Sequence, residues 1–374
     1  MVEIIILEPE IATEMIQNLQ NDNPVNWVFL DPILFLFSFL PRTHMSDTAE
    51  LNITIESFIR DNLYPTQKER DFVSEKYQEL RDIIPTEFSI FQSGSYARRT
   101  ANTPIADLDI ICDSDNPHES IPVLYKILEE AYRWKARVKL QTHSIGIYFW
   151  EDDEFSIDVV PVKKAINLPR NEFWDSLYEL PDFLKHSKSK RKDFYEGNKT
   201  SHSDPKWYIS QAIVVDRESD GRFKRAVKFL KRWNYWMKKD INSNEFNSFK
   251  SFHIEEIMKK FYIENPELEL YEGIFKFFQE WMSFLEKPQF LDRAGVVIKD
   301  NFFIDQYVAD DMTYEDKVLI GSYLEKWVTL MGLLIHGDDI DATLKTILFM
   351  NPIKKSVPKQ IIVPRTSWPA FVNF

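Results

Sequence analysis

The stretch FQSGSYARRTANTPIADLDI, residues 91–110, decides the fold. A turn at Gly94-Ser95 precedes two aspartates, Asp107 and Asp109, which lie in a strand-like run. Side chains two positions apart in a strand point to the same side, so both carboxylates share one face while their apolar neighbours face the core. Two carboxylates this close repel each other unless positive charge lies between them. The stretch therefore predicts a site that binds cations.

A third aspartate follows the same pattern. In FSIDVVPV, residues 155–162, Asp158 points away from the face shared by the apolar residues around it. Three converging carboxylates suit a hard divalent cation whose shell a substrate phosphate completes. Two ions about 4 Å apart would activate a hydroxyl and neutralise a leaving pyrophosphate. Asp107, Asp109 and Asp158 are therefore the candidate metal ligands and catalytic residues, with two Mg²⁺ ions per site, or Mn²⁺ in their place.

The turn at Gly94-Ser95 has a matching interpretation. If it leads into a helix, glycine permits close approach of the backbone, and the serine hydroxyl and free N–H groups bind terminal phosphates. Arg98 and Arg99 are nearby, and the sequence leaves open whether they contact phosphate or solvent. A lone Asp-x-Asp is usually a solvated strand end, but turn, pair and third aspartate in this order favour catalysis.

Composition restricts the partners. The chain has 374 residues, 44% hydrophobic and 14% aromatic, which is enough for a sizeable core in one or two domains. A formal net charge of −13 argues against a long nucleic-acid partner, since such partners are held by Lys and Arg. The single cysteine, Cys112, excludes an internal disulfide and a multi-cysteine zinc site.

The N-terminal residues are expected to stand apart from the rest. The apolar stretch 27–40 is too short to span a bilayer, is interrupted by Asp31 and Pro32, and is preceded by no basic residue. Met45 would serve as an ordinary start of a soluble chain. Residues 1–45 are therefore expected to be an extension of no assigned function, with a docking arm for a partner as the alternative.

Hydrophobic patterns predict a mixed sheet flanked by helices over residues 46–165. The polar, Lys-rich segment 166–206 is expected to be a linker and surface segment. The predicted division is an N-terminal extension 1–45, a catalytic domain 46–195, a helical lobe 196–345 and an extended tail 346–374. The predicted strands are 87–93, 106–113, 137–141, 144–151 and 155–162, and the main predicted helices are 119–134, 222–239, 251–262, 271–287 and 315–335.

The order of Gly94-Ser95, Asp107-Leu-Asp109 and Asp158 resembles the active-site pattern of the DNA polymerase β-type nucleotidyltransferase superfamily. More narrowly, the chain resembles the bacterial cGAS/DncV-like nucleotidyltransferases (CD-NTases, SMODS-type) of CBASS anti-phage systems. This narrower resemblance covers roughly residues 48–345 and adds SDP (203–205), FLKRWN (229–234) and KSFHIEEI (250–257). It implies an α+β fold, with a polymerase β-like palm (a mixed sheet flanked by helices) and a helical C-terminal lobe.

The resemblance also implies nucleotide contacts outside the turn. On the helix predicted at 222–239, Lys224, Lys228 and Lys231 share one face. By similarity to the family, Lys231, and Lys228 as second choice, would contact the phosphates across the cleft; the alternative is a solvated basic face. The segment 250–257 is expected to pack behind the cleft, with Ser251 as a candidate phosphate contact.

The function that the resemblance implies is condensation of NTPs, ATP among them, into a cyclic di- or oligonucleotide read by a downstream effector. With this function we expect a cytoplasmic location, no contact with a membrane and no activation by long nucleic acid. One rival keeps the fold and transfers the nucleotide to an RNA end, a protein or a small molecule. Another is a nucleotide-binding protein without catalysis, which would have no need of all three carboxylates.

Overall fold

The structure is a computed structural model that describes residues 45–141, 144–150, 155–164, 178–181, 200–241, 246, 248–285, 296–299, 307–309, 313, 316–317 and 319–324. The predicted N-terminal extension up to residue 44, the C-terminal tail and the second half of the helix predicted at 315–335 lie outside these ranges.

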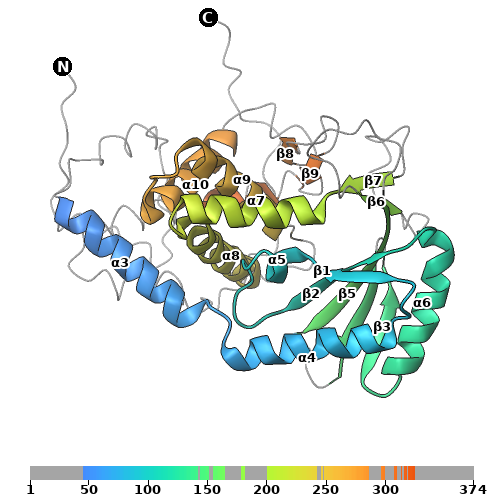
Figure 1. Cartoon of the computed structure of the whole chain (residues 1–374). Coiled ribbons are helices and arrows are strands. Elements are labelled where there is room, and N and C mark those ends of the chain that lie inside the picture. The colour runs from blue at the N-terminus through green and yellow to red at the C-terminus, as the bar shows by residue number, and fades with distance from the viewer. Residues whose placement is uncertain are drawn as a thin grey trace, which may run out of the picture.

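A mixed sheet lies at the right of Figure 1. Its strands run in the order β1-β2-β5-β4-β3, and β6 and β7 continue from the far end of β5. Strands β2 and β5 are parallel, and every other neighbouring pair in this sheet is antiparallel. The bounds are β1 Ser89–Gln92, β2 Asp107–Asp113, β3 Ala136–Leu140, β4 Ile145–Phe149, β5 Ser156–Lys164, β6 Tyr178–Pro181 and β7 Thr200–Ser203.

Two helices, α4 (Gln67–Ile83) and α6 (Pro117–Tyr132), cover one face of this sheet. Helix α4 begins with a capping box in which Thr66 and Glu69 satisfy each other's backbone N–H groups. Apolar side chains of both helices pack on alternate residues of β2, β4 and β5, all nearly or fully buried. The opposite face of β2 and β5 is not covered by these helices; it carries the aspartates of both strands and, further along, a small apolar cluster of Ile111, Val162 and Tyr178.

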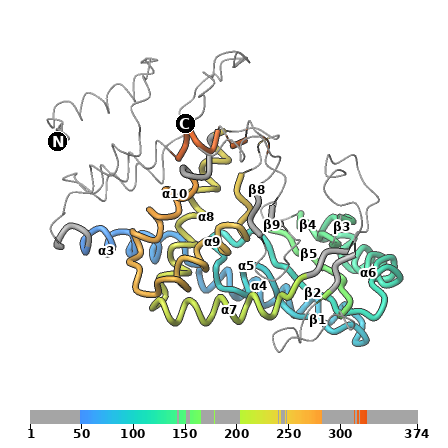
Figure 2. The backbone as a smooth tube through the Cα atoms, turned by 90° about the horizontal axis from the view of Figure 1, so that it is seen from above, coloured from blue at the N-terminus to red at the C-terminus, as the bar shows by residue number. Residues whose placement is uncertain are grey.

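The remaining helices form a second, aromatic-rich core beside the sheet (Figure 2). Its centre is Trp233, whose ring contacts Phe278 edge-to-face at 5.0 Å. Helix α3, the first described element, packs into this core through Leu51 and Ile55 although it precedes the sheet in sequence. The helices are α3 Met45–Asn62, α7 Pro205–Glu218, α8 Arg222–Ile241, α9 Ser251–Glu264 and α10 Leu270–Leu285.

The expected fold class is confirmed: an α+β polymerase β-like palm with a helical lobe. The expectation of an irregular linker is wrong in two places, because β6 and β7 fall inside segment 166–206 and pair with the sheet. Helix α7 was also not anticipated. Strands β8 (Val296–Lys299) and β9 (Tyr307–Ala309) form a separate pair. The four-part domain division stays a prediction.

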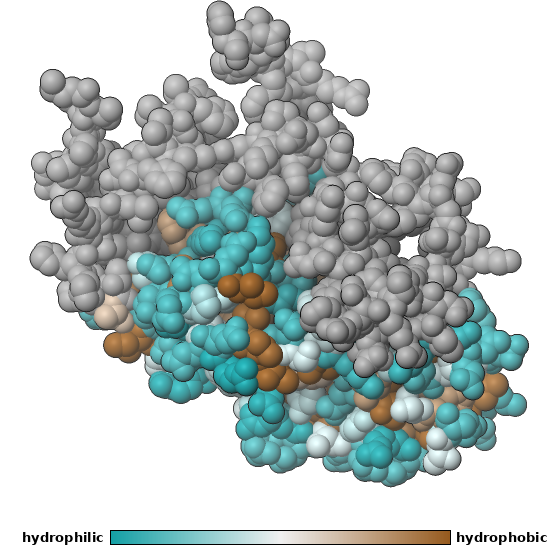
Figure 3. All heavy atoms as spheres, turned by 45° about the horizontal axis from the view of Figure 1, so that its top comes forward, coloured by the Kyte–Doolittle hydropathy of each residue, from teal (hydrophilic) through white to brown (hydrophobic). Residues whose placement is uncertain are grey.

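The surface is mostly polar. Figure 3 shows predominantly hydrophilic atoms over the described part of this face, with hydrophobic atoms in smaller patches. Within the described ranges, every helix is too short or too polar to traverse a lipid bilayer.

Candidate active site

The three aspartates lie on one face of two adjacent parallel strands. In the β2–β5 register Asp109 stands opposite Asp158, and Asp107 stands opposite Ser156. The intervening Leu108 is fully buried on the other face. The alternation predicted from the sequence is therefore present, and the palm carries its carboxylates on the face that α4 and α6 leave free.

These carboxylates repel one another. Burial, followed by the charges of Asp107 and Asp158, raises the pKa of Asp109 to about 7. Burial, and then Asp107, also raises the pKa of Asp158. Within the described ranges, no side chain donates a hydrogen bond to Asp107 or Asp109. The site therefore concentrates negative charge that the nearby Arg98 and Lys231 offset only in part.

The Gly94-Ser95 turn lies directly against this charge. Gly94 opens the four-residue helix α5 (Gly94–Ala97) with a φ of 66°, and the N–H of Ser93 donates to the Asp109 carbonyl at 2.8 Å. A Cβ added at Gly94 would lie 1.6 Å from Asp109 Oδ2. Glycine is thus required twice, for a left-handed backbone and for contact with a candidate catalytic carboxylate.

The donor chemistry of the three aspartates fits a divalent cation. They are oxygen ligands, the charge of Asp107 helps to raise the pKa of Asp109 and of Asp158, and the described side chains donate no hydrogen bond to Asp107 or Asp109. In the present conformation no group of three or more acidic, histidine or cysteine side chains among the described residues is gathered tightly enough to hold a metal ion. Asp158 accepts a hydrogen bond from Gln141.

Gln141 was not anticipated as a site residue. Its amide donates to Asp158 Oδ1 at 2.9 Å and to the hydroxyl of Tyr148 at 2.8 Å. Gly146, which pairs with Asp158 in the β4–β5 register, leaves room for this side chain, because a Cβ there would lie 2.4 Å from Gln141 Nε2. A glycine inside an otherwise apolar strand was the available sequence signal, since it often marks a close approach.

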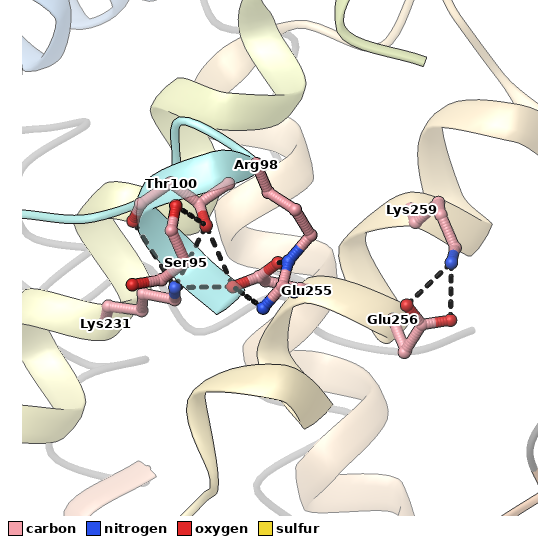
Figure 4. Close-up of polar contacts among 7 residues, drawn as sticks. All are labelled: Ser95, Arg98, Thr100, Lys231, Glu255, Glu256 and Lys259. Carbon is pink, nitrogen blue, oxygen red and sulfur yellow. Dashed lines mark hydrogen bonds and ion pairs between the residues drawn. The ribbon is translucent and has the colours of Figure 1, made fainter. Parts of the chain in front are cut away.

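Lys231 lies next to the turn, and its ammonium group donates hydrogen bonds to other groups of the protein (Figure 4). Its Nζ is 2.5 Å from Glu255 Oε1, 3.2 Å from Thr100 Oγ1 and 3.3 Å from the Thr100 carbonyl. Burial lowers the pKa of Lys231, while Glu255 opposes that effect. Thr100 in turn donates its N–H to the Ser95 carbonyl at 2.9 Å. Lys231 thus reaches the turn through Thr100.

Lys228, on the same helix, takes a similar place one residue further along the loop. Its Nζ donates to the carbonyl of Ala101 and lies 4.8 Å from the centroid of the Tyr64 ring. Burial, and then Lys231 and Lys224, lowers the pKa of Lys228 to about 7. Both lysines therefore support the loop that follows the turn.

The other predicted contacts lie further out. Ser251 is exposed at the first position of α9, and no described contact joins it to the turn. Arg99 is exposed, whereas Arg98 is largely buried against Glu255. The structure thus brings the three carboxylates and the Gly94-Ser95 turn together. Sequence reasoning did not identify Glu255 as the partner of Arg98 and Lys231.

The same architecture occurs in known structures. CdnC of Escherichia coli MS115-1 in complex with HORMA-deltaN gives a TM-score of 0.58 at 19% identity, covering 80% of this chain and 97% of that one. The same CdnC with ATP gives 0.58 at 19% identity, covering 81% and 99%. The chain has the fold of bacterial CD-NTases. The CD-NTase CdnG of Bradyrhizobium diazoefficiens with GTP gives 0.54 at 13% identity, covering 81% and 98%.

The comparison of structures finds similar proteins, whereas the comparisons of sequence find none. No protein-family model matches the chain, and no curated protein matches it. At identities of 13–19% the likeness to CD-NTases establishes the fold. It confirms the structural part of the predicted resemblance, and the chemistry must be argued from this chain's own residues.

Proposed function

We propose that this protein is a nucleotidyltransferase that condenses NTPs into a cyclic di- or oligonucleotide and releases pyrophosphate. The observation that carries the proposal is the convergence of Asp107, Asp109 and Asp158 beside the Gly94-Ser95 turn in a CD-NTase fold. CdnC and CdnG, which share the fold, have been solved with ATP and GTP respectively. An NTP is accordingly the proposed substrate of this chain.

Each residue has a proposed role. The Ser95 hydroxyl and the N–H groups of the turn bind the terminal phosphates. Lys231 and Lys228 add positive charge behind the turn and support the loop that positions it. Asp107, Asp109 and Asp158 hold two Mg²⁺ or Mn²⁺ ions, whose chemistry is to lower the pKa of a hydroxyl and to neutralise phosphate charge. Ser251 is retained as an outer phosphate contact.

Catalysis of this kind depends mainly on positioning. A ribose hydroxyl of one nucleotide attacks the α-phosphate of another, a P–O bond forms, and the bond to pyrophosphate breaks. The hydroxyl proton leaves towards the carboxylate face, and Asp158 aligns the attacking oxygen. A second transfer within the linear product closes the ring. We further propose that the product acts on a downstream effector in cytoplasmic anti-phage defence.

The test is incubation of the purified chain with all four NTPs and Mg²⁺ or Mn²⁺, followed by mass spectrometry. Phosphatase-resistant cyclic products are expected from the wild type and not from the double variant Asp107→Asn/Asp109→Asn. Pyrophosphate release only after RNA, a protein or a small hydroxyl compound is added would replace the proposal with transfer to that acceptor. Binding of labelled ATP with no pyrophosphate under any condition would favour a protein without catalysis.

A further inference from the structure

Glu255 is the most completely compensated buried charge near the turn. Its side chain is 3% exposed, and its carboxylate accepts from three residues of two different regions (Figure 4). Arg98 Nε donates to Oε2 at 2.5 Å and Arg98 Nη2 to Oε1 at 3.3 Å. Thr100 Oγ1 donates to Oε1 at 2.9 Å, and Lys231 Nζ contacts the same oxygen at 2.5 Å.

The residues of this hydrogen-bonded group come from two parts of the protein. Arg98 and Thr100 follow the phosphate-binding turn in the palm, whereas Lys231 and Glu255 come from α8 and α9 of the helical lobe. Thr100 and Ala101 donate their N–H groups to the Ser95 carbonyl at 2.9 and 3.2 Å. One carboxylate therefore ties the residues that shape the turn to two helices of the other lobe.

We propose that Glu255 is a positioning residue that sets the Gly94-Ser95 turn for NTP phosphates by fixing Arg98, Thr100 and Lys231 together. The inference rests on the proposed function, because the turn is taken to bind a triphosphate. Glu255 itself contacts no substrate in this arrangement. Its effect reaches the phosphates through the hydrogen bonds of Thr100 and Ala101 to Ser95.

The physical argument is one of compensation. A buried carboxylate with a bidentate arginine, a lysine and a hydroxyl keeps its charge; Arg98 and Lys231 hold the pKa of Glu255 at about 2 against the effect of burial. Removing that charge leaves two buried cations without their counterion, so that they and the attached loop must move. A displacement of the order of 1 Å at a phosphate site is enough to weaken binding and transfer.

The experiment compares two adjacent glutamates of α9 by titrating purified full-length protein with a non-hydrolysable ATP analogue. Glu255→Gln is expected to raise the Kd of the analogue at least about tenfold in the folded fraction, because the turn loses its anchor. Glu256→Gln is the matched control. Glu256 pairs with Lys259 within the same helix at 2.6 Å, so this change is expected to leave Kd within about twofold.

A second variant covers the case in which Glu255→Gln does not fold. Thr100→Val keeps the shape of the side chain and removes one donor to Glu255, and it is expected to raise Kd about threefold. A double-mutant cycle uses Arg98→Met, Glu255→Met and the double variant Arg98→Met/Glu255→Met. The fold increase in Kd of the double variant should be clearly smaller than the product of the fold increases of the two single variants. Such coupling in Kd is not expected from a residue that only stabilises the fold.

The outcomes are distinct. A Kd for Glu255→Gln within twofold of the wild type, with a lower Tm alone, would reduce Glu255 to a structural residue and overturn the proposal. Tighter binding would also overturn it, because Glu255 would then compete with phosphate for Arg98 and Lys231. If the wild type bound no NTP analogue, the proposed function would fail together with the inference. If the wild type bound the analogue and formed product but Glu255→Gln behaved normally, only the inference would fail.

Discussion

Two groups of charged residues lie side by side in this molecule, and they are built in opposite ways. Asp107, Asp109 and Asp158 face one another with their repulsion largely unrelieved, and the pKa of Asp109 rises to about 7. Glu255, by contrast, is surrounded by Arg98, Lys231 and Thr100, and its pKa falls to about 2. Charge that the fold has compensated serves the structure, whereas charge left uncompensated is available to a ligand.

The largest effect is expected from removing an uncompensated charge. Asp109→Asn should lower product formation at least about a thousandfold, because the uncharged amide of asparagine is a poor ligand for the divalent cations that neutralise the phosphate charge. The same change should stabilise the fold by about 2 kcal/mol above pH 7 in the presence of EDTA. The measurements are initial rates by mass spectrometry and chemical unfolding.

The sign of the stability change follows from the pKa. The pKa of Asp109 in the folded protein, about 7, lies above its ordinary value of 3.8. The contribution of this carboxyl group to the free energy of unfolding is therefore fully present below about pH 4 and is lost as the pH rises through 7. Asparagine cannot ionise and avoids that loss. Asp115→Asn, at an exposed loop position, is the control and should change neither quantity. Lower stability of Asp109→Asn at pH 8 would contradict the repulsion argument.

The second prediction concerns the contact between the turn and the carboxylate. Gly94→Ala should reduce activity about a hundredfold, since its Cβ would overlap Asp109 Oδ2 and its φ of 66° disfavours a side chain. Gly221→Ala is the matched control: Gly221 has a φ of 76°, but its Cβ would meet only the flexible end of Arg225. The control should lose about 1 kcal/mol of stability and keep its kcat. Equal losses of kcat in both variants would show that backbone strain alone is responsible.

The third prediction uses Lys228, a buried charge that is compensated only in part. Its folded pKa, about 7, lies below the ordinary 10.5, so between these values the unfolded chain binds the extra proton. Stability of the wild type should therefore rise with pH above 7, by at most about 1.4 kcal/mol per pH unit from this group. Lys228→Met should remove this slope, and Lys238→Met, at an exposed position on the same helix, should keep it. Unfolding by urea at pH 7, 8 and 9 measures the slope.

The smallest effect is expected at Gln141. Gln141→Leu removes the donor to Asp158 and should lower kcat about fivefold, because a carboxylate that loses its hydrogen bond is less well oriented. Gln78→Leu, which breaks an exposed Gln–Asp pair within α4, is the control and should leave kcat unchanged. An unchanged kcat in Gln141→Leu would show that Asp158 is oriented without it.

The strand that carries Asp107 and Asp109 could be predicted from the sequence, because the alternation of apolar and polar residues is a local pattern. The alternation around Asp107 and Asp109 places them on one face whatever the rest of the chain does, since the period of a strand is two. The strands β6 and β7 were missed for the converse reason. Strand β6 alternates over only four residues, Tyr178–Pro181, and β7 is wholly polar, so neither stands out in the sequence. They form strands because the end of β5 pairs with β6, and β6 pairs with β7.

The sequence by itself thus determined the α+β fold class, the shared face of Asp107 and Asp109 and the turn that precedes them, because these depend on local patterns in the chain. The pairing of β2 with β5, which brings Asp158 opposite Asp109, is a tertiary contact. Only the tertiary structure decided where the lysines and Glu255 act. Glu255 lies 157 positions from Arg98 and 155 from Thr100. Packing of α8 and α9 against the loop after the turn buries all four side chains together, and burial obliges them to neutralise one another.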